Sequence, residues 1–298
     1  MWTKIKSVFG KASNGLNNVD NSLYNLKVVN GLDALELNMA VDNMKKNKVD
    51  AYLIKNALDL EQINLLKKYY FSLEKIDKEL AGTYPISFLT KMYAREYEES
   101  YFEDNEKFGE SVKKEIGFDL LGFIESTLSK LNDGKQTVIK KAPNNKGSFA
   151  PFQFRGLRKG GANIHVHCEN CHQTWAPELN DKLKEHKLQP NGIPYFFTIQ
   201  KSKGGNIVLF DVKWKDGQVL DKINEDHFKI VNPNGKKLDC SPNGTVKRME
   251  IETEPGDLFI FNGGEIYHMV QRVDDDQMRI TVGGFINTTM DNKEEIWA

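Results

Sequence analysis

The sequence predicts an α+β fold, with a jelly-roll β core in the C-terminal half and mostly helices in the N-terminal half. Apolar residues recur at three-and-four spacing up to Leu131, and at alternate positions after Ala150. A turn-rich bridge, Lys140 to Pro151, separates the two patterns. We therefore expect helices packed around one integrated β core.

The N-terminal half contains a short strand and two amphipathic helical segments. The strand opens the stretch Asp50–Asp59, and the helical segments are Leu58–Leu80 and Val112–Leu131. We expect residues 21–145 to form a helical support region. Residues 1–20 are expected to be a flexible or amphipathic terminus, because no apolar run or cleavage pattern of a secretory signal is present.

The C-terminal half, residues 146–298, contains seven or eight short runs rich in aromatic and β-branched residues, which predict strands. Two segments interrupt them. Cys171–Gly192 is expected to form a loop and a helix, and Asn232–Gly244 an exposed loop dense in turns.

Composition indicates an ordinary soluble protein of 298 residues, 39% hydrophobic and 28% charged. The 41 basic and 42 acidic residues nearly cancel, which argues against nucleic acid as a partner, and no apolar run is long enough to cross a membrane. Three cysteines make a poor disulfide framework, so we expect the protein to be located in the reducing cytoplasm. Oligomeric state cannot be inferred.

The stretch Ile164–Gln173, IHVHCENCHQ, is open to three chemical interpretations. Cys168-x-x-Cys171-His172 has the spacing of covalent haem attachment, but a cytoplasmic protein with a strand-like motif does not favour haem. Zinc would need four convergent ligands, and His186 and Cys240 are the remaining candidates, so no structural zinc is expected. The third interpretation is a strand carrying a mononuclear iron site.

Alternation on a strand would place His165, His167 and Glu169 on one face, with Cys168 on the other as a small core residue. A distant segment supplies His268, followed eleven residues later by Arg279 and then by Thr281. This constellation resembles the Fe(II)- and 2-oxoglutarate-dependent dioxygenase superfamily, whose core is a double-stranded β-helix. The resemblance covers roughly residues 150–287 and is supported by GLRKGGANIH, SKGGNIVLFD and PGDLFIFNGGEIYH.

The resemblance implies that His167, Glu169 and His268 bind Fe(II), with open positions for 2-oxoglutarate and O2. It implies that Arg279 and Thr281 bind the far carboxylate of 2-oxoglutarate. His165 could replace His167 in a His-x-His arrangement, or could be a pocket residue or a packed histidine.

Glu169 bears on the type of reaction. The superfamily mostly has Asp at this position, and its halogenases have Gly or Ala, which opens a place for chloride. With Glu169 present, hydroxylation of an unactivated carbon is expected, and desaturation or ring closure remains open.

Substrate residues are harder to assign. Candidates around the entrance are His165, Asn170, Gln173, Trp175, Arg155 and Arg158, and Trp297 could close over the site or dock on helices. The expected substrate is a small amino-acid-like molecule or natural product, with a protein side chain (prolyl-type) second. A non-catalytic β-barrel that binds a metal or ligand is the rival class.

Overall fold

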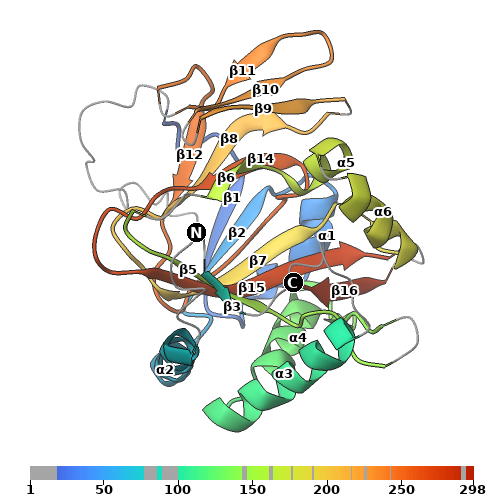
Figure 1. The fold of residues 1–298 in the computed structure, drawn as a ribbon, viewed down its shortest axis with the longest axis vertical. Helices are drawn as coiled ribbons and strands as arrows, with labels where there is room; N and C mark the ends of the chain where they lie inside the picture. The colour runs from blue at the N-terminus through green and yellow to red at the C-terminus, as the bar shows by residue number, and fades with distance from the viewer. Residues whose placement is uncertain are drawn as a thin grey trace.

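A computed structural model gives the fold over residues 19–76, 86–88, 100–142, 146–160, 164–175, 177–189, 191–215, 217–224, 227–241, 243–289 and 293–298. The predicted flexible or amphipathic terminus lies almost wholly outside these described residues. The structure consists mostly of β-sheet and has a few helices. Two facing sheets lie at its centre (Figure 1).

Eight strands form the core. Four belong to a large sheet in the order β5 (Gln153–Leu157), β15 (Arg279–Thr288), β7 (Ile193–Gln200) and β13 (Leu258–Phe261). The other four form a small sheet in the order β12 (Arg248–Ile251), β8 (Ile207–Lys213), β14 (Ile266–Val270) and β6 (Ile164–His167). All these neighbours are antiparallel, and the chain passes repeatedly from one sheet to the other, which is the arrangement of a jelly roll.

Alternation along each strand of the large sheet separates an inner face from an outer face. On β13, Phe259 and Phe261 point into the space between the sheets, whereas Leu258 and Ile260 point outward. The same rule places Arg279 and Thr281 of β15 on the inner face, because Ile280 and Val282 belong to the outer core.

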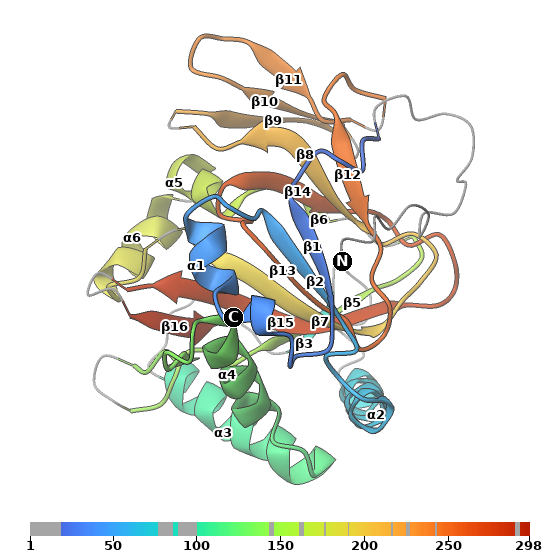
Figure 2. The ribbon, with the colours of Figure 1, turned by 180° about the vertical axis from the view of Figure 1, so that it is seen from behind.

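Helices cover the outer face of the large sheet (Figures 1 and 2). They are α2 (Leu60–Ile76), α3 (Ser100–Ile116), α4 (Leu120–Leu131) and, at one end, α1 (Ala40–Lys45) with the short η1 (Leu35–Leu37). The segment predicted as one helical stretch, Val112–Leu131, is two helices, because Gly117 adopts φ 68° and ends α3. No helix in the described ranges is both long and apolar enough to cross a membrane.

The region predicted as a helical support also contributes strands to the large sheet. The parallel pair β1 (Leu26–Asn30) and β2 (Ala51–Lys55) extends it beyond β13, and β3 (Ile86–Phe88) pairs with β5. At the other edge, β16 (Glu294–Trp297) joins β15 and pairs with β4 (Val138–Ile139). The N-terminal half therefore helps to build the sheet as well as to cover it.

The two predicted interruptions contain more structure than expected. The first holds η3 (Glu169–Cys171), α5 (His172–Trp175) and α6 (Pro177–Glu185). The second forms part of a separate three-stranded sheet of β9 (Val219–Asn224), β10 (His227–Val231) and β11 (Lys237–Asp239). This sheet lies beyond the small sheet (Figure 1). Its buried residues Phe228 and Ile230 pack with residues of β6, β8 and β14 in a separate core cluster.

Candidate metal centre

Strand pairing brings two histidines together from distant parts of the chain. His167 is the last residue of β6 and His268 is the middle residue of β14, and the two are register partners. Their ring centroids are 4.3 Å apart. The 100 residues between these positions are spanned by the jelly-roll crossovers, so the topology of the fold brings the two histidines together.

Backbone carbonyls orient both imidazole rings in the same way. The Nδ1 of His167 lies 2.7 Å from the carbonyl oxygen of His165, and the Nδ1 of His268 lies 2.9 Å from that of Ile266. A carbonyl only accepts, so each Nδ1 carries the proton and each Nε2 is left with its lone pair. Metal-binding histidines are commonly held by such a hydrogen bond.

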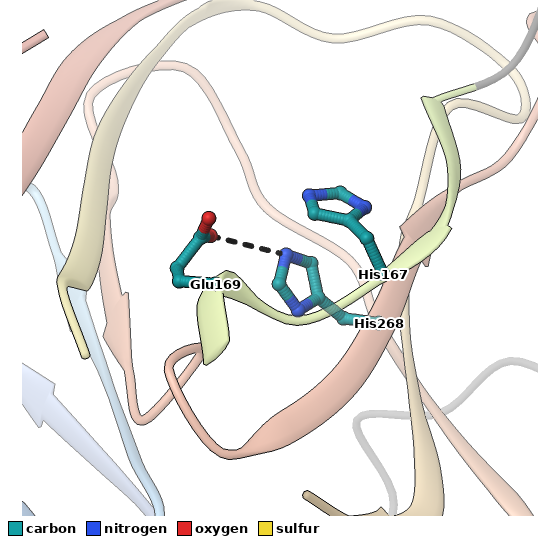
Figure 3. A group of neighbouring side chains, drawn as sticks. All are labelled: His167, Glu169 and His268. Atoms are coloured by element: carbon teal, nitrogen blue, oxygen red, sulfur yellow. Dashed lines mark ion pairs between the residues drawn. The ribbon is translucent and has the colours of Figure 1, made fainter. Parts of the chain in front are cut away.

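Glu169 completes a group of three possible ligands, shown in Figure 3. One ligand atom from each of His167, Glu169 and His268 lies within 4.8 Å of the others. The carboxylate Oε1 of Glu169 is 3.9 Å from Nε2 of His268. Two imidazoles and one carboxylate at this separation match the donor set that Fe(II) takes in a two-histidine, one-carboxylate site.

A glycine turn fixes the position of Glu169. The amide of Glu169 donates to the carbonyl oxygen of Gly263 at 3.1 Å, and the amide of Asn170 donates to that of Gly264, also at 3.1 Å. This turn leads directly into β14, which carries His268. The same short segment thus positions the carboxylate and one histidine.

Burial makes the Glu169 carboxylate costly without a cation. The side chain is 8% exposed. Burial, reinforced by the nearby Cys171, raises its pKa to about 8, against a smaller opposing effect of Arg155. A bound divalent cation would stabilise the ionised form, so the burial of this acid fits a metal ligand.

The expected single row of His165, His167 and Glu169 on one strand face is wrong in two respects. Strand β6 ends at His167, and Glu169 lies in η3. A β-bulge opposite Met269 also interrupts the alternation between His165 and His167, because His268 pairs with His167 but Val270 pairs with Ile164. The ring of His165 stacks on Phe228 of β10, with centroids 6.0 Å apart, and also stays 6.0 Å from the ring of His167. His165 is not one of the three grouped residues.

Arg279 and Thr281 lie on the inner face of β15, with 6% and 3% exposure. The guanidinium of Arg279 stands 5.2 Å from the centroid of the Phe196 ring. Burial and the charge of Arg155 lower the pKa of Arg279 to about 10, so it remains a cation at neutral pH. No described acidic side chain forms an ion pair with it, which leaves a buried guanidinium suited to a carboxylate from a ligand.

The remaining predicted pocket residues are dispersed. Arg155 is half-buried on β5, directly opposite Thr281. Asn170 is buried beside the metal group, and Gln173 is exposed and donates to the Asn170 side chain at 3.4 Å. Arg158 lines a hollow next to Phe71 of α2, on the helix side of the large sheet. The side chain of Trp175 lies outside the described residues.

The cysteines and Trp297 belong to packed regions. Cys168, Cys171 and Cys240 are all buried in the core between the small sheet and the three-stranded sheet, as predicted for Cys168. His186 is buried among aromatic rings elsewhere. Trp297 stacks on Phe285 and donates to Asn287 at 2.6 Å, so it docks at the sheet edge.

Sequence reasoning did not identify three features of the site. Phe196 is the aromatic partner of Arg279. The turn at Gly263–Gly264 holds Glu169, and the side chain of Gln153 accepts a hydrogen bond from Arg155. The glycine pair within IFNGGEIYH was visible in the sequence, but its contact with the loop after β6 depends on tertiary structure.

Residues 29–298 match the protein family described as the carrier-protein-independent halogenase WelO5. The chain belongs to this family. The match, together with the His–Glu–His group, confirms the predicted membership of the Fe(II)- and 2-oxoglutarate-dependent superfamily and the prediction of Fe(II) and 2-oxoglutarate as metal and cosubstrate. No curated protein sequence matches this WelO5 family member.

Several solved structures are distantly similar to this WelO5 family member. The N-substituted L-amino acid dioxygenase from Burkholderia ambifaria AMMD is 14% identical, covers 87% of this chain and 90% of its own, and gives a TM-score of 0.48. The carbocyclase SnoK from nogalamycin biosynthesis is 10% identical, with 87% of each chain covered and a TM-score of 0.45. A Pseudomonas putida prolyl-4-hydroxylase is 11% identical, covers 84% of this chain and 93% of its own, and gives a TM-score of 0.39.

Proposed function

We propose that this protein is an Fe(II)- and 2-oxoglutarate-dependent hydroxylase of a small molecule, although its family is described as a halogenase. The observation that carries the proposal is the carboxylate of Glu169 within the group of His167 and His268. Halogenases of the superfamily have Gly or Ala at this position. A carboxylate there occupies the place where chloride would bind.

The site residues have distinct tasks in this proposal. His167, Glu169 and His268 hold Fe(II), with the Nδ1–carbonyl hydrogen bonds keeping both rings in the metal-binding tautomer. When bound, Fe(II) with 2-oxoglutarate activates O2 for insertion of one oxygen atom into a C–H bond, with succinate and CO2 as coproducts.

The inner face of the large sheet binds and shields the cosubstrate. Arg279 and Thr281 bind the far carboxylate of 2-oxoglutarate, the guanidinium through its fork and the hydroxyl as a second donor. Phe196 packs under the guanidinium and excludes water from this charged contact. All of these groups are presented by one integrated β core, so we infer a single catalytic domain.

Halogenation is the second candidate function, because the family description favours it. It requires a halide next to the metal, and therefore displacement of the Glu169 carboxylate. Two hydrogen bonds hold the Glu169–Asn170 backbone to the glycine turn, which disfavours such movement. A protein side-chain hydroxylase and a non-catalytic binding module are weaker alternatives, because neither accounts for the family match.

The decisive experiment measures both cosubstrate use and product. Protein loaded with Fe(II) and 2-oxoglutarate without air should develop the weak visible charge-transfer band of this superfamily. In air, free amino acids and related metabolites are then screened for stimulation of succinate release in chloride-containing buffer. The product should carry an added oxygen and no chlorine isotope pattern, and Glu169→Ala and Arg279→Ala should abolish succinate formation. A chlorinated wild-type product would contradict the proposal.

A further inference from the structure

A row of aromatic rings connects Arg279 with the metal ligand His268. The row, called here the aromatic row, consists of Phe196 of β7 and of Phe259 and Phe261 of β13. The guanidinium of Arg279 stands 5.2 Å from the centroid of the Phe196 ring, and that ring lies 5.7 Å from Phe259. The rings of Phe259 and Phe261 stack at 5.0 Å, and Phe261 meets the ring of His268 edge to face at 4.8 Å.

Strand pairing fixes the aromatic row on the inner face of the large sheet. Phe196 and Phe259 are register partners on β7 and β13, so their side chains project from the same face. Phe261 lies two residues beyond Phe259 and shares that face. The alternate residues Phe197 and Ile260 belong to the outer core. Phe259 and Phe261 are 0% and 2% exposed, so these two rings have little freedom to move.

A glycine allows Phe196 to lie against β15, the strand that carries Arg279. Gly283 is the register partner of Phe196 on β15. A Cβ added at Gly283 would lie 2.7 Å from the Cβ of Phe196, which is too close for two side chains. Glycine at this position is therefore required for the contact between the two strands that brings the Phe196 ring beside the guanidinium.

The other end of the aromatic row leads into the metal group. Phe261 is the last residue of β13, and the chain continues through the Gly263–Gly264 turn into β14. The turn holds the backbone of Glu169, and β14 carries His268. The imidazole of His268 is held by the carbonyl oxygen of Ile266 at Nδ1 and by the ring of Phe261. Together these contacts fix the direction of its Nε2 lone pair.

We infer that the aromatic row positions both ends of the cosubstrate site. Phe261 holds the imidazole of His268. Phe196 holds the guanidinium of Arg279, and Phe259 packs between the two rings. The inference rests on the proposed function, in which Arg279 binds the far carboxylate of 2-oxoglutarate and His268 binds the metal. Because contiguous packed rings join the two ends, their separation is fixed, and the site selects a 2-oxo diacid by its length.

The series of 2-oxo diacids provides the measure of this selection. Between the keto group and the far carboxylate, oxaloacetate has one methylene group, 2-oxoglutarate two and 2-oxoadipate three. The shorter acid would lose one of its two anchors, and the longer acid would have to bend to keep both. The three phenylalanines act on this choice through His268 and Arg279, so they are positioning residues.

The test compares the three diacids on protein loaded with Fe(II) without air. Phe259→Leu is the central variant, because leucine stays apolar but removes the ring contacts on both sides. Phe197→Leu is the matched control. Phe197 is also 0% exposed and lies next to Phe196 on β7, but it faces the outer core, where its ring lies 5.7 Å from Phe123. Urea unfolding measures stability, and the charge-transfer band reports the affinity for each diacid.

Wild type and Phe197→Leu should bind 2-oxoglutarate at least about tenfold more tightly than either other diacid, as expected for one hydrogen bond to a charged group. Phe259→Leu should weaken 2-oxoglutarate binding by about 2- to 13-fold, the range for one aromatic contact, and reduce the preference over 2-oxoadipate by a similar factor. Fe(II) affinity should fall by the same range in Phe261→Leu and Phe259→Leu and stay within about twofold in Phe196→Leu and Phe197→Leu.

Two results would overturn the inference. One is wild-type protein that binds the three diacids equally. The other is a folded Phe259→Leu protein that loses as much stability as Phe197→Leu but keeps the wild-type preference and Fe(II) affinity, which would make the rings ordinary core. If Phe259→Leu does not fold, the half-buried Phe196→Leu decides by the same preference. Absence of the charge-transfer band in wild type would instead count against the proposed function.

Discussion

His167 and His268 are register partners on β6 and β14, and their Nδ1 atoms are both directed at the carbonyl oxygen two residues earlier in their own chain segment. The two rings are therefore fixed relative to each other by strand pairing and relative to the backbone by hydrogen bonds. This arrangement prepares two Nε2 lone pairs for a shared ion before the ion binds.

The first prediction separates the two histidines of β6. His167→Phe should lower Fe(II) affinity by more than the roughly 10–100-fold typical for loss of an outer-shell partner, because a ligand itself is lost. His165→Phe is the matched control and should keep iron, since the His165 ring stacks on Phe228, and the backbone carbonyl that orients His167 and an aromatic ring at this position are both retained. Anaerobic Fe(II) titration measures both. Iron loss in the His165 variant alone would favour the His-x-His alternative.

The second prediction concerns the proposed anchor of 2-oxoglutarate. Arg279→Gln should weaken 2-oxoglutarate binding by about 10–150-fold, the range for one hydrogen bond to a charged group, and Thr281→Val by about tenfold or less. Thr198→Val is the control, because Thr198 is the partner of Thr281 on β7 but its hydroxyl is 2.7 Å from that of Thr253. The charge-transfer band reports all three affinities. Equal losses in Thr281→Val and Thr198→Val would indicate a general packing effect.

The third prediction removes the carboxylate that argues against halogenation. Glu169→Gly should lose hydroxylation and gain a chloride-dependent change in the charge-transfer band, because the metal then has an additional open position. Glu169→Asp keeps the charge and should retain binding of iron without responding to chloride. Titration of chloride without air provides the measurement. If Glu169→Gly ignores chloride, the open position is not accessible to a halide.

Periodic signals in the sequence predicted the jelly-roll class, and the resemblance to the superfamily predicted that His167, Glu169 and His268 come together, as they do in the structure. His167-x-Glu169 is local, and His268, Arg279 and Thr281 follow one another within a single segment. Alternating apolar residues likewise predicted β5–β8 and β13–β15. The strand signals depend only on which face of an element a residue occupies.

Features that depend on a partner segment could not be predicted. The bulge that interrupts the alternation between His165 and His167 exists only in the pairing of β6 with β14. β1 went unnoticed because it has five residues, mostly exposed, and gains its place by pairing with β2. Gly117 was visible within a helical pattern, but its left-handed φ of 68°, which ends α3, is a property of the folded backbone.

The fourth prediction concerns stability at low pH. His186 is 9% exposed beside the rings of Phe149 and Phe102, and burial lowers its pKa below the usual 6.5. Below about pH 6.5 His186 is protonated in the unfolded chain but stays neutral in the folded chain until a lower pH. The free energy of unfolding therefore falls as pH falls. Between about pH 7.5 and pH 5.5, wild type should lose more unfolding free energy than His186→Phe in urea titrations. Parallel losses would show that His186 titrates alike in both states.

The fifth prediction tests the turn that links Glu169 to β14. A Cβ at Gly263 would lie 2.4 Å from Cγ of Pro194, so Gly263→Ala must displace the turn, at a cost of about 1–3 kcal/mol of unfolding free energy. Because the Gly263 carbonyl accepts from the amide of Glu169, the displacement should also move the carboxylate and lower Fe(II) affinity. Gly109→Ala in α3 is the control, since its Cβ would meet Pro151 and Leu121 at ordinary distances of 3.6 and 4.0 Å and alanine favours a helix. Urea unfolding of the metal-free protein and anaerobic Fe(II) titration measure the two effects. A destabilised Gly263→Ala protein with unchanged iron affinity would show that the turn supports the fold without positioning Glu169.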